Sequence, residues 1–245
     1  MRSMGDRTAR SREGFASSEG PGPPRAGPVV GLMRRIIAIV GAGIAVAASI
    51  PVLGGASDRV PLLTDAAVRV PAGMVEHTVT VQDVTGPHAA RRRVRAELWL
   101  TRDRGRELVT DELTGEVVAE TTAASGEIRV YEPELDRITV ERRRELPFAS
   151  AAYEAAAQRA ALESGHTRKL REQIVGGRRA LVTESPGGRT TTVVDAETYE
   201  LLERRTTLAG AVQTEHRTTE LLPAGSPRAK LEMRPHPGAK VVQAS

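Results

Sequence analysis

After Met74 the chain alternates between apolar and polar residues over short segments, and turn residues separate these segments. Between residues 93 and 101, apolar residues occupy every second position. Successive side chains of a strand point to opposite faces, so this period of two predicts a strand with one buried face. The same pattern predicts further strands over residues 107–110, 116–120, 127–131, 137–141, 167–175, 178–184, 189–195, 199–207 and 212–221, with a last short strand near 230–233.

One segment breaks this alternation and predicts a helix. Ser150 suits the N-cap position, and Gly165 follows just past the expected end. Residues 62–68 are a second, shorter candidate helix. Between Ser150 and Gly165, apolar residues recur at helical spacing and should lie on the sheet: Tyr153, Ala156, Ala157, Ala160 and Ala161.

These elements predict a mainly β fold of the α+β type. We expect about ten strands in a single curved antiparallel sheet, a half-barrel, closed by one or two helices and preceded by an N-terminal apolar helix. A sheet this wide must curl or split. If it curls, its inner apolar face and the helix enclose a cavity. The candidates for the cavity wall are Val94, Ala96, Leu98, Leu100, Ile128, Val130, Ile138, Val140, Tyr153 and Ala157.

An apolar segment near the start predicts export. Met33-Arg34-Arg35 precedes residues 36–56, which carry no charged side chain. A basic patch, an apolar run and small exit residues are typical of a signal peptide. The run is also about the 20 residues that a membrane-spanning helix needs, so a retained anchor stays open. In either case the positive-inside rule places the rest of the chain outside the cytoplasm.

The same features divide the chain into four parts. Residues 1–32 are rich in Arg, Ser, Gly and Pro, cannot bury a core, and should form a disordered tail or an upstream mis-start. Residues 33–56 form the signal peptide or anchor. Residues 57–233 form the sheet domain, and residues 234–245 form a flexible C-terminal tail.

Charge and cysteine content exclude several classes of protein. The formal net charge of +4 resides in residues 1–35, which hold seven arginines and three carboxylates, so the remainder is balanced. We therefore expect no nucleic-acid partner, despite the basic isoelectric point. The absence of cysteine excludes structural disulfides and a lipid-modified cysteine.

The chain also lacks a catalytic signature. Its five histidines are scattered without a paired spacing, no G-x-S-x-G elbow occurs, and no cysteine nucleophile is present. We expect no enzymatic activity, no metal and no cofactor. Trp99 is open to two interpretations: it is exposed and contacts a membrane or partner, or a helix or sheet edge covers it.

Three local features carry a resemblance to a known family. They are Glu97-Leu98-Trp99-Leu100, the turn Val130-Tyr131-Glu132-Pro133, and the hairpin Val194-Asp195-Ala196-Glu197-Thr198-Tyr199. With the order of signal, short helix, meander, helix and second meander, the chain resembles the LolA-like outer-membrane lipoprotein carrier superfamily. This superfamily includes RseB-type sensors and mycobacterial lipid-binding lipoproteins. The resemblance covers roughly residues 60–233 and implies a half-barrel whose apolar concave face holds acyl chains.

We therefore expect a periplasmic or otherwise extracytoplasmic, non-enzymatic binder or carrier of lipid or lipoprotein acyl chains in the cell envelope. If residues 36–56 are not cleaved, the membrane is a further partner. The alternative is an envelope-stress sensor that binds a membrane regulator protein. A third interpretation is a structural domain with a filled core and no ligand.

Overall fold

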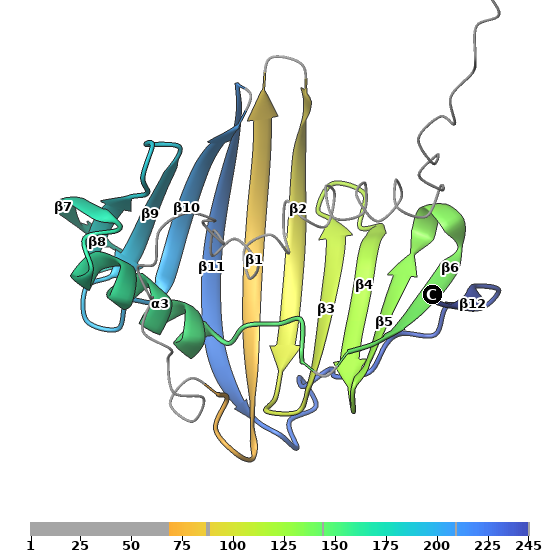
Figure 1. The fold of residues 1–245 in the computed structure, drawn as a ribbon. Coiled ribbons are helices and arrows are strands. Elements are labelled where there is room, and N and C mark those ends of the chain that lie inside the picture. The colour runs from red at the N-terminus through yellow and green to blue at the C-terminus, as the bar shows by residue number, and fades with distance from the viewer. Residues whose placement is uncertain (1–68, 87–88, 144, 209, 245) are drawn as a thin grey trace, which may run out of the picture.

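The computed structural model describes residues 69–86, 89–143, 145–208 and 210–244. They form one open, curved sheet of twelve strands, in the order β12-β6-β5-β4-β3-β2-β1-β11-β10-β9-β8-β7, and helix α3 lies across one face of it near β8–β10 (Figure 1). The predicted mainly β fold with one large curved sheet is confirmed. The predicted apolar helix before the sheet lies outside the described residues. Within the described residues, no helix is long and apolar enough to cross a membrane.

The elements agree with most of the predicted segments, although β12 lies beyond the strand expected near residues 230–233. Their bounds are β1 Met74–Gly86, β2 Ala89–Leu100, β3 Arg104–Asp111, β4 Val117–Ala124, β5 Glu127–Glu132, the 3-10 turn η1 Pro133–Leu135, β6 Arg137–Arg142, α3 Ala151–Glu163, β7 Arg168–Val175, β8 Arg178–Glu184, β9 Thr190–Asp195, β10 Leu201–Leu208, β11 Ala211–Pro223 and β12 Lys240–Gln243.

Short turns join strands that are neighbours in both sequence and space. Gly176 and Gly177 connect β7 to β8 with φ angles of 55° and 80°. Two consecutive positive φ angles are what a two-residue turn matched to strand twist requires, and glycine adopts them without strain. The hairpin that the Gly-Gly pair predicts is therefore present.

The pairing of β1 with β11 joins the two meanders into one sheet. It runs from Met74 opposite Pro223 to Thr85 opposite Val212. The paired residues lie more than a hundred residues apart in sequence, so no local sequence pattern predicts this pairing. It places β1, β2 and β11 at the centre of the sheet.

The strand register assigns each side chain to one of two faces, which we call the helix face, carrying α3, and the back face. Residues directly opposite each other in an antiparallel pair share a face. Glu76 lies opposite Leu100, and Leu100 lies opposite Gly105, so all three belong to the helix face. The intervening residues, including the opposed pair His77 and Trp99, belong to the back face.

The apolar cluster on the back face explains the environment of Trp99. This side chain is 1% exposed and packs with Val75, Leu108 and Leu222. It stacks on His77 with 4.9 Å between ring centroids, and the Lys230 ammonium lies 5.7 Å from its ring. Trp99 is thus covered, and the cover comes from the segment after β11, which also contributes Ala229 and Leu231.

This C-terminal segment is anchored on a fully buried carboxylate. Glu120 accepts hydrogen bonds from Arg106 Nε at 2.7 Å and from the backbone N–H of Arg234 at 2.9 Å, and His236 Nε2 lies 2.9 Å away. Strand β12 then pairs with β6 in parallel. The expectation of a flexible tail over residues 234–245 is therefore corrected, because these contacts make most of it part of the sheet domain.

Helix α3 begins and ends as its sequence predicts. The Ser150 hydroxyl accepts a hydrogen bond from Tyr153 N at 3.1 Å, and Gly165 follows the helix with a φ of 72°. Near the end of the helix, Leu162 packs against a helix-face cluster that includes Leu181 and Val194. Capping and this contact fix α3 across the sheet, which leaves its first turn over the central strands.

Candidate functional site

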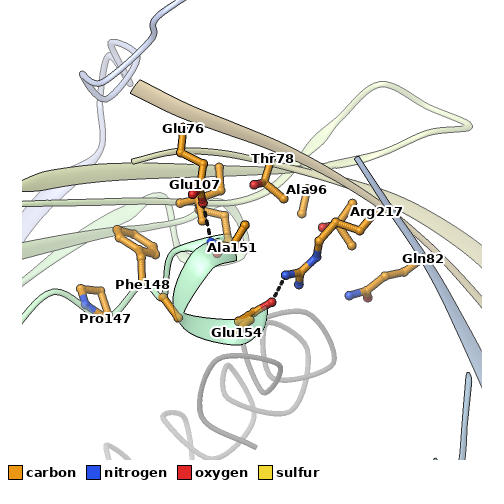
Figure 2. Close-up of a pocket in the computed structure, with 13 residues that line it drawn as sticks. Glu76, Thr78, Gln82, Ala96, Glu107, Pro147, Phe148, Ala151, Glu154 and Arg217 are labelled. Atoms are coloured by element: carbon orange, nitrogen blue, oxygen red, sulfur yellow. Dashed lines mark hydrogen bonds and ion pairs between the residues drawn. The ribbon is translucent and has the colours of Figure 1, made fainter. Parts of the chain in front are cut away.

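A cavity of about 50 Å³ lies between the helix face and the start of α3 (Figure 2). Strands β1, β2, β3 and β11 form its floor, and the segment that enters α3 forms its roof. Its lining consists of Glu76, Thr78, Thr80, Gln82, Ala96, Leu98, Glu107, Pro147, Phe148, Ala149, Ala151, Glu154 and Arg217.

The floor is polar along the whole of its central strand. Glu76, Thr78, Thr80 and Gln82 occupy every second position of β1, so all four side chains point into the cavity. The Glu76 carboxylate accepts a hydrogen bond from Ala151 N at 2.9 Å. This bond satisfies a free N–H group at the helix N-terminus, where negative charge is favoured.

One side of the cavity is apolar. Ala96 and Leu98 of β2 lie opposite Thr80 and Thr78, and Phe148 adds an apolar ring to the lining from the segment before α3. The cavity is therefore amphipathic, with a hydrophobic side next to a row of polar groups.

Gly105 of β3 allows the Phe148 ring to approach the sheet. A Cβ atom at position 105 would lie 2.5 Å from Phe148 Cδ2 and 3.0 Å from Leu100 Cδ1. We expect Gly105→Ala to displace the ring and to lower the free energy of unfolding by about 1–3 kcal/mol, a typical cost of overpacking. Urea denaturation measures this change. Gly225→Ala, which meets no atom within 4 Å, is the control and should have little effect; equal losses for both variants would contradict the contact.

Ion pairs surround the end of the cavity that β11 forms. Arg217 pairs with Glu154 of α3 and, at 3.0 Å, with Glu215, which is 1% exposed. Arg204 of β10 lies 3.6 Å from the same Glu215. Two guanidinium groups therefore balance two carboxylates, and they tie α3 to the sheet.

Two carboxyl groups at the other end have no such compensation. Burial raises the pKa of Glu76 to about 7, against the opposing effects of its bond to Ala151 N and of Arg217. Burial also raises the pKa of Glu107 to about 7, with only the charge of Arg217 opposing it. The pKa of Glu154 is raised by burial as well, although Arg217 opposes the shift. The cavity thus holds carboxyl groups that are poised to change charge near neutral pH.

Some polar atoms of the cavity have no hydrogen-bond partner. Gln82 is 2% exposed, and its Nε2 makes no hydrogen bond; Arg217 Nε also lacks a partner. The Glu107 carboxylate, which is partly buried, makes no hydrogen bond or ion pair with any described residue. Buried polar groups are normally paired, so this cavity is suited to a polar ligand or to bound water.

The structure brings together only some of the residues that the sequence predicts for the cavity. Ala96 and Leu98 line it. Val94, Leu100, Ile128 and Val130 share the helix face by register but do not line the cavity, and neither do Tyr153 and Ala157 of α3.

Ile138 and Val140 were assigned to the wrong face. Val130 pairs with Thr139, which puts Thr139 on the helix face and the residues on either side of it on the back face. A shift of one residue moves every side chain of a strand to the other face, and the apolar alternation of β6 serves the back face. These two side chains therefore cannot form a wall together with Ala96 and Leu98.

Sequence reasoning missed the polar groups of the site, which are Glu76, Gln82, Glu107, Glu154 and Arg217. For two of them, Glu76 and Gln82, the signal was present in β1, where polar residues alternate with valines such as Val75, Val79 and Val81. Alternation alone assigns the valines to the core and the polar residues to solvent. Here both faces of the central strand are covered, so the polar residues are interior as well.

The described residues offer no metal centre, since no group of three or more His, Asp or Glu side chains among them could hold an ion. Instead, His77 lies between Glu220 and Glu97, at 2.9 Å and 3.3 Å, and His236 contacts Glu120. These contacts lie on the back face, away from the cavity.

Comparison with known proteins gives structural matches alone. No family model matches the chain, and no curated protein matches it. The fold is similar to a LolA superfamily protein from Nitrosomonas europaea, with 9% identity over 68% of this chain and 93% of that one, at a TM-score of 0.32. MucB in complex with MucA(peri) matches with 15% identity, 66% and 55% coverage and a TM-score of 0.39. Mycobacterium tuberculosis lipoprotein LppX matches with 12% identity, 60% and 85% coverage and a TM-score of 0.32.

These matches are of the three kinds that the sequence resemblance names: a LolA superfamily protein, an RseB-type protein and a mycobacterial lipoprotein. Because all three TM-scores are below 0.5, we base the function on the residues of this chain.

Proposed function

We propose that this chain is an exported or membrane-anchored, non-enzymatic protein of the cell envelope that binds a lipid or the acyl chain of a lipoprotein. The amphipathic cavity on the helix face is the observation that carries this proposal. Ala96, Leu98 and Phe148 offer contact to an acyl chain, while Glu76 and its polar neighbours on β1 face a polar end. A cavity of about 50 Å³ accommodates one end of such a ligand, so the rest extends along the helix face.

Mass spectrometry of co-purified lipid tests this proposal. The full chain is expressed in a bacterium that exports it, purified without detergent and extracted with organic solvent. Lipid at close to one molecule per protein supports the proposal. A folded protein that carries no lipid, and takes none up from vesicles, overturns it. The Leu98→Asp variant is expected to retain less lipid, because a charge would replace part of the apolar side.

A second candidate function is the binding of a membrane regulator protein, and the free edge of the sheet favours it. Strand β7 is last in the sheet order and pairs only with β8 among the described residues. Leu170 and Ile174 on this strand are 40% and 67% exposed. An exposed edge strand with apolar side chains can accept an extended segment of a partner.

Crosslinking distinguishes this candidate. A photo-crosslinker at Ile174 of β7 should capture one defined membrane protein in cells. The same group at Leu113, which is 77% exposed in the turn between β3 and β4, should not. Equal capture from both positions would contradict a docking role for β7.

A further inference from the structure

The charges around the cavity do not balance. On β10 and β11, Arg204 and Arg217 are matched by Glu215 and by Glu154 of α3. The remaining charged groups that face the cavity are the carboxyls of Glu76 on β1 and Glu107 on β3. Glu200, in the turn before β10, adds further negative potential at Glu76. The site therefore has two carboxyl groups in excess.

An independent observation shows that the same cavity is incomplete. The Gln82 side chain is 98% buried and lines the cavity, yet its amide nitrogen has no partner. The amide of Gln82 offers either a donor or an acceptor, because its two ends can exchange by rotation. Together with the unpaired Glu107 carboxylate, this leaves an acceptor and an amide for a molecule that enters from outside (Figure 2).

We infer that the cavity recognises a primary ammonium group on the headgroup of an aminated lipid, and that the carboxylates of Glu107 and Glu76 hold this group. The inference rests on the proposed function. An ammonium group is a compact donor of three hydrogen bonds. A volume of about 50 Å³ has room for a group of this size. The phosphate that follows the amine in such a headgroup accepts from the free donor Arg217 Nε, since Arg217 lies opposite Thr80, two residues along β1 from the level of Glu107. The acyl chains continue along the apolar side, past Leu98.

Recognition of a cation by these carboxyls makes binding depend on pH. Both have a pKa of about 7 without ligand, so each is mostly protonated at pH 6 and mostly ionised at pH 8. The ammonium group binds the ionised form, and the displaced protons pass to solvent. Affinity should therefore fall about tenfold for each participating carboxyl between pH 8 and pH 6.

The test compares two lipids with the same acyl chains. The full chain is incubated with vesicles of equal parts phosphatidylethanolamine and phosphatidylglycerol, re-isolated without detergent, and its lipid is measured by mass spectrometry. At pH 8 we expect about tenfold or greater enrichment of phosphatidylethanolamine. At pH 6 the enrichment should disappear.

Matched variants assign this preference to the carboxyls. Glu107→Gln removes the charge from a side chain that has no hydrogen bond to lose, and Glu76→Gln keeps an oxygen that accepts from Ala151 N. Each variant should bind lipid with the preference for phosphatidylethanolamine reduced or lost. Glu163→Gln, at the exposed end of α3, should behave like the unmodified chain.

The outcomes separate the inference from the proposed function. Equal uptake of both lipids, or an unchanged preference in both variants, overturns the ammonium site while lipid binding stands. No uptake of either lipid, from a folded chain, overturns the proposed function and, with it, a lipid headgroup as the ligand of the ammonium site. Free ethanolamine is the second probe: binding of ethanolamine with the same pH dependence, without lipid uptake, supports ammonium recognition and overturns the lipid headgroup as its source.

Discussion

Replacing Glu120 by alanine is expected to lower the free energy of unfolding by about 3–5 kcal/mol. The change leaves the Arg106 guanidinium, whose side chain is 2% exposed, without its carboxylate partner. It also removes the acceptor for Arg234 N and the partner of His236 Nε2. Removal of one member of a buried pair is costly because the other charge stays desolvated. The same change should loosen the C-terminal segment that covers Trp99.

Urea denaturation at pH 7 measures this effect. The matched control is Glu116→Ala, which removes an exposed carboxylate just before β4 that makes no hydrogen bond in the described part of the chain. The control should change the free energy of unfolding by about 0.5 kcal/mol or less. Similar small losses for both variants would show that the buried Glu120 and Arg106 pair does not form.

Local sequence signals were enough for most of the strands, the hairpins and α3, although no separate strand was predicted for β1 and β12 lies beyond the strand expected near residues 230–233. The Ser150 cap and the Gly176-Gly177 turn act through their immediate neighbours, so each could be predicted from a few residues. The central pairing of β1 with β11 depends on residues such as Met74 and Pro223, which are far apart in sequence. The C-terminal segment depends likewise on the distant Glu120, and its own Pro-rich composition indicated only a tail.

The candidate site could be predicted only in part, for a related reason. The alternation in β2 correctly put Ala96 and Leu98 on a covered face. In β6 the same reasoning failed, because alternation shows that Ile138 and Val140 share a face without showing which face of the sheet it is. The burial of the polar side chains on β1 that start at Glu76 could not be predicted from the sequence of β1, because it comes from the approach of α3.

The ligand-free chain is expected to be most stable near pH 5 and to lose stability as the pH rises towards 8. Glu76 and Glu107 have a pKa of about 7 in the folded state, against 4.5 for an ordinary glutamate. Below pH 4.5 both states keep these protons. Between pH 4.5 and 7 the unfolded chain releases them while the folded chain holds them, so rising pH favours unfolding. Each group contributes up to about 3 kcal/mol of destabilisation, complete above pH 7.

Glu107→Gln should remove the contribution of that residue. Its free energy of unfolding should match that of the unmodified chain at pH 4.5 and exceed it by up to about 3 kcal/mol at pH 8. Urea denaturation across this range, without lipid, measures the difference between the two proteins. Glu97 and Asp195, whose pKa values are lowered, act in the opposite sense and below pH 4.5, so they leave this window unaffected. A difference that stays constant from pH 4.5 to 8 would mean that the pKa of Glu107 is not raised, and this carboxyl would then contribute nothing to the expected loss of ammonium affinity between pH 8 and pH 6.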